Sequence, residues 1–307
     1  MLITSILTTA LAGALVTASS SPTIHKRDAA PWAGSNLYFL HALPIEEQER
    51  YINTLAGWGV KVIRLWVTGL PGGCIKGSPN TTAIPHLEPT TVGTYDTTVL
   101  AALDATLALL HSAGLKAIIS PHDAGQIAGA NGCDAYCAKY GNQTAFYTSA
   151  QGIQDYDARL AVVLGYESPA FGGRKWGELS EVVMAFDVQN EPMIDAVGLL
   201  EEGDPGDWAE DWAYFITGDA SILKAVEEAD PRKEVVIEEW GVAADSEDGF
   251  NTQVEVFNDA GVPWLYWQVV PGKDQTQNGS LANCGYDGFE IGLNSAKGNV
   301  SSALTKA

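Results

Sequence analysis

Hydrophobic and polar residues follow two patterns along the chain, one typical of buried strands and the other of amphipathic helices. Short apolar runs bounded by turn residues predict six strands, at residues 35–40, 60–67, 116–120, 182–188, 234–241 and 262–270. Between them, apolar residues recur at three- and four-residue spacing and predict helices, at residues 44–59, 99–110, 156–166 and 251–260. Strands separated by helices are typical of an α/β fold with a parallel sheet.

The number of these units favours a (β/α)8 TIM barrel, which takes about 250 residues, but the pattern is short of strands. Between residues 191 and 234 there is one plain helical stretch, residues 219–231, and one ambiguous run, residues 212–217. A single βαβ unit takes roughly 30 residues or more. We therefore expect an incomplete barrel that lacks about one to two βα units between its fourth and seventh strands.

The N-terminal residues predict export from the cell. Residues 1–20 are apolar and end in small residues, as a signal peptide does. Residues 21–27 then form a short propeptide that ends in a dibasic pair, although two ordinary surface charges are the alternative. No repeat or linker divides residues 28–307, so we expect one mature domain.

Cysteine and asparagine usage agrees with a secreted, extracellular protein. An even number of cysteines in such a chain favours two disulfides; the four are Cys74, Cys133, Cys137 and Cys284. Three pairings are possible, and a local bond between Cys133 and Cys137 would leave Cys74 with Cys284. A zinc site is the weaker alternative, because no histidine lies at ligand spacing. Glycosylation triplets begin at Asn80, Asn142, Asn278 and Asn299.

The formal net charge of −21 narrows the choice of partners. Nucleic acids and anionic membranes are bound by basic patches, so we expect neither as a partner. A neutral or cationic substrate fits this charge better, and we expect a monomer.

Carboxylates follow two of the predicted strands. Glu191 ends the run "VVMAFDVQNEP", and Glu238 and Glu239 end the run "EVVIEEWG". Barrel enzymes keep their chemistry at the C-terminal ends of strands, and glycoside hydrolysis requires two carboxyl groups on either side of one bond. Solvated strand ends are the alternative for any single glutamate, but the pair favours a catalytic site.

The motifs "QNEPM" and "IEEWG" resemble those of the family 5 glycoside hydrolases, the cellulase- and β-mannanase-like enzymes with two catalytic glutamates on a TIM barrel. The resemblance extends over most of residues 32–270. It implies that residues 28–307 are a catalytic domain, with Glu191 as acid/base on the fourth strand and Glu239 as nucleophile on the seventh. It also implies that no cofactor and no metal is needed.

Four further residues match substrate-site positions of that family. "RLW" resembles its second-strand arginine, so Arg64 would orient the nucleophile. "SPHD" resembles its third-strand histidine, which implies that His122 binds substrate. Asn190 matches the asparagine that binds the sugar 2-hydroxyl, and Trp267 matches the tryptophan that forms a sugar platform.

The chemistry sets requirements on the two glutamates. Glu191 must hold a proton, so burial and the second carboxylate should raise its pKa. Glu239 must be ionised, which Arg64 would favour. Because side chains alternate along a strand, we expect Glu238 to point to the outer face.

The sequence thus predicts a secreted, retaining endo-β-1,4-glycanase that hydrolyses a cell-wall polysaccharide. β-Mannan is the first choice of substrate, because "GSNLYFL", "GVKVIRLW" and "YWQ" look most like β-mannanases; a cellulase or other β-glucanase is the alternative. From another class, the chain could be a truncated, weakly active or inactive carbohydrate-binding protein. The chain has no histidine after His122, so the sixth-strand histidine of the family is absent.

We expect that the short segment reflects loss of an internal piece, either in the gene model or by splicing, rather than a divergent fold. Sequencing of transcripts across residues 205–215 should therefore reveal a longer form. Finding only the present form would favour a divergent fold that compensates for the shortage.

Overall fold

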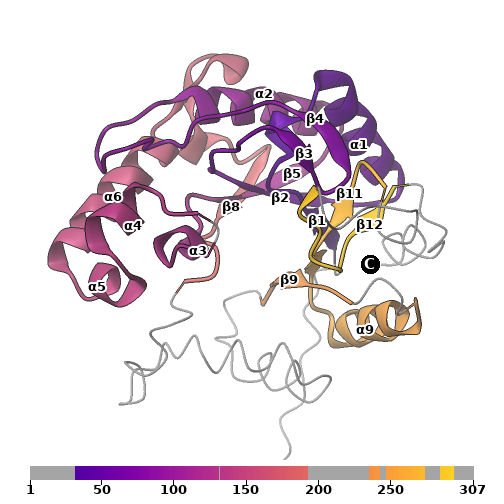
Figure 1. The fold of residues 1–307 in the computed structure, drawn as a ribbon. Coiled ribbons are helices and arrows are strands. Elements are labelled where there is room, and N and C mark those ends of the chain that lie inside the picture. Colours follow the sequence, from indigo (N-terminus) through magenta and orange to yellow (C-terminus); the bar gives the residue numbers. More distant parts are fainter. Residues whose placement is uncertain (1–31, 131, 193–234, 243–246, 274–283, 294–307) are drawn as a thin grey trace, which may run out of the picture.

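A computed structural model of the protein describes residues 32–130, 132–192, 235–242, 247–273 and 284–293 (Figure 1). Its main sheet has six parallel strands in the order β8-β5-β2-β1-β10-β9. These are β1 (Ala33–Asn36), β2 (Val62–Trp66), β5 (Lys116–Ser120), β8 (Val183–Phe186), β9 (Ile237–Trp240) and β10 (Trp264–Tyr266). Because β1 pairs with both β2 and β10, the first and last strands of the main sheet are neighbours, as in a TIM barrel, and the predicted class of an α/β barrel that is incomplete is confirmed.

The barrel is incomplete in the part of the chain that the structure describes. There, β8 and β9 each pair on one side only, so the sheet is an open arc. The predicted shortage of βα units falls on residues 193–234, which lie outside the described residues. Met184 and Val188 are 40% and 62% exposed. The prediction that residues 182–188 form a buried strand is therefore wrong for Met184, Ala185 and Val188, which are exposed, because β8 has a described neighbour on one side only.

Two predicted strands have different bounds in the structure. The run at residues 35–40 continues beyond β1 because Leu37 and Leu40 are buried in a turn, where Leu40–Ala42 form the short 3-10 helix η1. The run at residues 262–270 is interrupted after β10, and β11 (Val269–Val270) pairs with β12 (Ile291–Gly292) in a separate sheet. In both cases the residues remain buried after the chain has left the main sheet, so the apolar run is longer than the strand.

Helices cover the outer side of the arc (Figure 1), chiefly α1 (Ile45–Gly57), α2 (Thr98–Ser112), α6 (Ala150–Leu164) and α9 (Glu247–Ala260). The apolar face of α2, including Leu103 and Leu107, is fully buried in the same core cluster as Leu65 of β2 and Ile119 of β5. A smaller cluster, formed by Val62, Ile118 and Leu265, fills the inner side. Alternate residues of each strand thus face helices and barrel interior.

Shorter elements lie in the loops. They are β3 (Gly73–Ile75), β4 (Ser78–Thr81), α3 (Ala124–Ile127), α4 (Ala135–Tyr140), α5 (Gln143–Tyr147), β6 (Glu167–Ser168), η2 (Pro169–Phe171), β7 (Arg174–Lys175) and η3 (Trp176–Glu178). Within the described ranges, no helix is long and apolar enough to span a bilayer.

Of the three possible pairings of the cysteines, the structure has the one with a local disulfide between Cys133 and Cys137. Cys133 and Cys137 are joined at a Cα–Cα distance of 5.2 Å. Cys74 is joined to Cys284 across 210 residues of sequence, a closure that is worth roughly 5 kcal/mol in the chain-entropy account of disulfides. No cysteine is left free.

Because side chains in β8 and beyond its end are exposed, a substitution there should change the free energy of unfolding less than one in the neighbouring strand β5. Val188→Thr should change the free energy of unfolding by less than about 0.5 kcal/mol, since the side chain is already in solvent. Ile119→Ala, at a fully buried position, should cost about 2–5 kcal/mol. Denaturant unfolding of both variants measures this, and equal losses would mean that the edge of β8 is covered.

Candidate active site

The guanidinium of Arg64 is the centre of the site. It is 2% exposed and lies on β2, from which it reaches four side chains. Nε and Nη2 contact Oδ2 of Asp187 at 2.9 and 2.8 Å, Nη2 donates to Oδ1 of Asn190 at 3.1 Å, and Nη1 donates to Oδ1 of Asn36 at 3.2 Å. Nη1 also forms a short ion pair with Glu239. The predicted contact between Arg64 and the nucleophile position is thus present.

These partners keep a buried cation charged. Burial by itself lowers the pKa of Arg64, but the carboxylates of Asp187, Glu239 and Glu238 more than offset this, and the pKa is raised overall. Ser120 of β5 donates a further short hydrogen bond to Asp187. The site therefore contains a fixed positive charge at the C-terminal ends of the strands.

A β-bulge places two glutamates of β9 toward Arg64. The register between β10 and β9 shifts, because Trp264 and Tyr266 pair with Ile237 and Trp240, so that two steps on β10 match three on β9. An extra residue in a strand disrupts the alternation of its side chains.

Glu238 consequently lies on the same side as Glu239. Its Oε2 is 3.8 Å from Nε of Arg64, and its side chain is 39% exposed. The prediction that Glu238 points to the outer face is wrong, because the argument from simple alternation does not allow for the bulge.

Glu191 lies beyond the end of β8, on backbone that is held by the end of β5. The main-chain N–H of Asn190 donates to the carbonyl of His122 at 2.8 Å, and the N–H of Ala124 donates to the carbonyl of Asn190 at 3.0 Å. Asn190 also donates from Nδ2 to Asp123 at 3.1 Å. Glu191 itself has a φ of 44°, a left-handed conformation that costs about 1–3 kcal/mol in a residue with a side chain and is common at functional sites.

Burial raises the pKa of both candidate catalytic glutamates. For Glu191, burial and the charge of Asp123 raise the pKa, while Arg64 lowers it. For Glu239, burial raises the pKa to about 7, with Arg64 acting in the opposite direction and the charge of Glu191 adding to the rise. Arg64 contacts both Glu239 and Asn190, the neighbour of Glu191, so the two glutamates belong to one site. Arg64 lowers the pKa of Glu239, as expected, but burial raises it more, so the pKa of Glu239 is raised overall.

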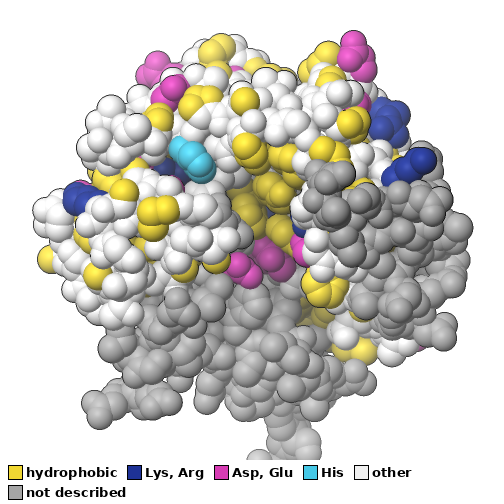
Figure 2. Space-filling view, viewed as in Figure 1, with side chains coloured by type: hydrophobic (Ala, Val, Ile, Leu, Met, Phe, Trp, Pro, Cys, Tyr) yellow, Lys and Arg dark blue, Asp and Glu magenta, His cyan; other side chains and the backbone are white. Residues whose placement is uncertain are grey.

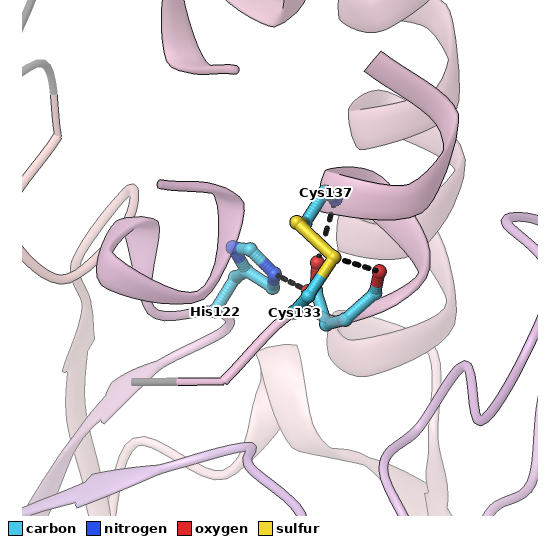
Figure 3. Close-up of a disulfide and its surroundings, with 4 residues drawn as sticks. His122, Cys133 and Cys137 are labelled. Atoms are coloured by element: carbon cyan, nitrogen blue, oxygen red, sulfur yellow. Dashed lines mark hydrogen bonds and ion pairs between the residues drawn. A yellow bond between two sulfur atoms is a disulfide. The ribbon is translucent and has the colours of Figure 1, made fainter. Parts of the chain in front are cut away.

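His122 is buried, and both of its ring nitrogens contact protein groups; Figure 3 shows the ring beside the disulfide of Cys133 and Cys137. It is 1% exposed, with Nε2 at 2.6 Å from Oδ2 of Asp134 and Nδ1 at 2.8 Å from Nε2 of Gln189. Both ring nitrogens therefore have protein partners, and neither faces a sugar in this arrangement.

Trp267 is half-buried within a group of three aromatic side chains. Its ring stacks on Trp66 at a centroid distance of 5.3 Å and on Tyr38 at 6.0 Å. Its Nε1 donates to Oδ2 of Asp287 at 2.7 Å. Asp287 in turn pairs with Lys76 at 2.5 Å.

This group is anchored from two directions. Lys76 also bonds to the fully buried Glu290 at 2.6 Å, and the disulfide between Cys74 and Cys284 joins the same two loops. The orientation of the Trp267 ring thus depends on a loop that is distant in sequence. Figure 2 shows the result as a hollow in the surface, with hydrophobic side chains on its wall and acidic side chains at its base.

Several residues of the site were not predicted from the sequence. Asp187 had a signal, because it is a charged residue at the end of an apolar run that must find a buried partner. Asp134, Gln189 and Asp287 lie in loops, where no periodicity identifies them. Among the described residues, no group of three His, Cys, Asp or Glu side chains has the arrangement of a metal site.

The fold of the chain is similar to those of several solved structures. No protein-family model matches the sequence, and no curated protein matches it. The endo-1,4-β-mannanase of Rhizomucor miehei is 14% identical with a TM-score of 0.63, over 90% of this chain and 93% of that chain. The hyperthermostable endo-1,4-β-D-mannanase of Thermotoga petrophila RKU-1 is 16% identical with a TM-score of 0.62, over 90% of this chain and 98% of that chain.

A third similar structure is the glycoside hydrolase family 5 mannosidase of Rhizomucor miehei, 13% identical with a TM-score of 0.57, over 91% of this chain and 93% of that chain. At these identities the likeness establishes the fold. The chain therefore has the barrel fold of these glycoside hydrolases.

The raised pKa of Glu239 predicts a pH-dependent gain in stability for Glu239→Gln. The folded-state pKa of about 7 lies above the ordinary value of 4.5, so the wild-type fold binds this proton more tightly than the unfolded chain. Stability from this group is complete below pH 4.5 and is lost as the pH rises through 7. As the pH rises from 4 to 8, the free energy of unfolding of the variant should increase by on the order of 3 kcal/mol relative to that of wild type.

Thermal or denaturant unfolding at several pH values measures this difference. Glu178→Gln, at an exposed position, controls for the loss of a surface charge. A difference between Glu239→Gln and wild type that does not vary with pH would show that Glu239 is not held in a carboxylate-disfavouring environment.

Proposed function

We propose that the protein is a secreted, retaining endo-β-1,4-glycanase of the family 5 type that hydrolyses β-mannan. The observation that carries this proposal is the convergence of Glu191 and Glu239, from the ends of two strands, around the buried guanidinium of Arg64. Two carboxyl groups in one hollow are what acid-assisted cleavage of a glycosidic bond requires.

The two glutamates divide the reaction between them. Glu191 donates its proton to the glycosidic oxygen as the bond to the anomeric carbon breaks, and the carboxylate of Glu239 attacks that carbon. Glu191 then removes a proton from water, which displaces Glu239 and restores both groups with retained configuration. Burial raises the pKa of both groups, to about 7 for Glu239, and the reactive state is the one in which Glu191 holds the proton and Glu239 is the carboxylate paired with Arg64.

Arg64 and Asn190 act on this pair without exchanging protons. The ion pair with Arg64 directs the Glu239 carboxylate and favours its ionised form. Asn190 is fully buried, with its Oδ1 held by Arg64 and its Nδ2 bonded to Asp123; in the proposed site the second N–H of its amide is the group that meets the sugar 2-hydroxyl. Trp267 offers an aromatic surface for a sugar ring, as stacking on the flat face of a pyranose requires.

Substrate and location rest on separate arguments. β-Mannan is supported by the similar solved structures, which are named as endo-1,4-β-mannanases and a mannosidase. Secretion is supported by the two disulfides, which persist in oxidising compartments, and by the exposure of the glycosylation positions Asn80 and Asn142.

A second function is favoured by the open arc of strands. Among the described residues β8 pairs with β5 alone, Met184 on it is exposed, and so is Val188 beyond its end, so the described support of Glu191 comes from one side. If that support is insufficient for catalysis, the protein binds the polysaccharide without cleaving it.

Assays of the full chain on mannan and on cellulose separate these functions. Wild type should release reducing ends from mannan, and Glu239→Gln should lose at least about 1,000-fold in kcat, since it removes the nucleophile. Glu238→Gln is the comparator for the neighbouring carboxylate, and a larger loss there would overturn the assignment of the nucleophile. Activity on cellulose alone would replace mannan by a β-glucan.

Binding measurements complete the test. Glu239→Gln should still bind mannan oligosaccharides, because the sugar contacts remain. A wild-type protein that binds them but cleaves no polysaccharide would establish the binding function and contradict the hydrolase. Equal cleavage by wild type and Glu239→Gln would contradict both the mechanism and the site.

A further inference from the structure

The protein partners of His122 fix which ring nitrogen carries its proton. The carboxylate of Asp134 only accepts, so Nε2 of His122 donates to it at 2.6 Å. In a neutral ring Nδ1 is then the acceptor, and it faces the amide nitrogen of Gln189 at 2.8 Å, while Oε1 of Gln189 bonds to the Tyr147 hydroxyl at 2.5 Å. An amide nitrogen only donates, which agrees with this assignment.

The charges around this ring agree with a neutral histidine beside an ionised aspartate. Burial lowers the pKa of His122, Asp134 and Asp123 oppose this, and Arg159 adds to the lowering. Burial alone would raise the pKa of Asp134, but the hydrogen bonds from His122 and from the Cys137 amide reverse this, and the pKa is lowered.

Asp134 is held at both of its carboxylate oxygens (Figure 3). Oδ1 accepts from the main-chain N–H of Cys137 at 2.9 Å and caps the start of α4. Oδ2 meets His122. The disulfide between Cys133 and Cys137 closes a short loop around Asp134, so the backbone of this residue is restrained as well as its side chain.

His122 in turn holds the end of β8 in two ways. Its ring accepts from Gln189, and its main-chain carbonyl accepts from the N–H of Asn190 at 2.8 Å. Glu191 follows directly in the chain. Because β8 is unpaired on its other side among the described residues, this segment depends on such contacts, and those of His122 add to the bonds that Ala124, Asp123 and Arg64 make with Asn190.

We propose that Asp134, clamped by the disulfide of Cys133 and Cys137, is a positioning residue that acts through His122 and Gln189 on the strand end carrying Asn190 and Glu191. The inference deepens the proposed hydrolase function and rests on it. It assigns His122 to positioning rather than to direct contact with a sugar.

Kinetics of three variants on the preferred polysaccharide test the proposal. Asp134→Ala leaves a buried N–H of His122 without a partner, and kcat should fall at least about 10-fold with a smaller change in KM. Asp134→Asn keeps one acceptor where the carboxylate has two, one for the Cys137 N–H and one for His122, so its kcat should lie between those of wild type and Asp134→Ala. Asp155→Asn is the matched control, because Asp155 bonds to Lys139 and Tyr140 of α4 without contacting His122.

The pH profile of kcat separates positioning from plain stability. In Asp134→Ala a looser strand end admits water to Glu191 and removes part of the burial that raises its pKa. The alkaline limb should therefore move to lower pH, whereas Asp155→Asn should keep the wild-type limb. An unmoved limb or an unchanged kcat in Asp134→Ala would overturn the proposal.

A measurement without substrate keeps this result distinct from the proposed function. In the full chain labelled with nitrogen-15 histidine, the His122 signals should be those of a neutral ring protonated at Nε2, and they should change in Asp134→Ala and in the double variant Cys133→Ser/Cys137→Ser. A ring protonated at Nδ1, or signals that the variants leave unchanged, would overturn the inference. A wild type with these signals but without hydrolysis would contradict the proposed function alone.

Discussion

The buried charge of Arg64 is the constraint on which the site depends. A guanidinium that is 2% exposed is costly unless its donors are all satisfied, and no single strand can satisfy them. The partners come from β1, from the segment after β8 and from β9. Folding of the arc and assembly of the site are therefore one event. Asn36 extends the network, because its Nδ2 donates to the carbonyl of Glu238 at 2.8 Å and so ties β9 to β1 across β10.

The same network explains why two opposing effects meet at Glu239. Removal from water disfavours a carboxylate, while a contacting guanidinium favours it, and in this site burial is the larger effect. The bulge in β9 adds Glu238 to the same face, so that three carboxylates share one cation with Asp187 among them. Such crowding raises proton affinity at the cost of stability, which is the usual relation between a reactive group and the fold that holds it.

The sequence predicts the fold because the strands follow patterns with a fixed period, whereas the choice of Glu191 and Glu239 as a pair rests on their positions after two strands and on the resemblance of their motifs. Apolar runs located all six strands, and the rule that parallel strands end at one edge brought Glu191 and Glu239 together. The predictions that were wrong concern features that depend on how the strands pair. The side of Glu238 is decided by a register shift between strands, and the exposure of Met184 by the lack of a described neighbour for β8. Asp134 and Asp287 lie in loops, where only the folded chain places them.

An open arc must hold its two glutamates in place without a closed wall between them. The chain of hydrogen-bonded strands from β8 to β9 runs through β5, β2, β1 and β10, and small errors along five pairings would add up at the active site. Arg64 shortens this path, since one residue contacts Asn190 beside Glu191 and also contacts Glu239. The loop restraints on His122 and Trp267 lie on either side of it. Arg64 is therefore a direct link between the segments that carry Glu191 and Glu239, beside the contacts that the residues after β5 make with Asn190.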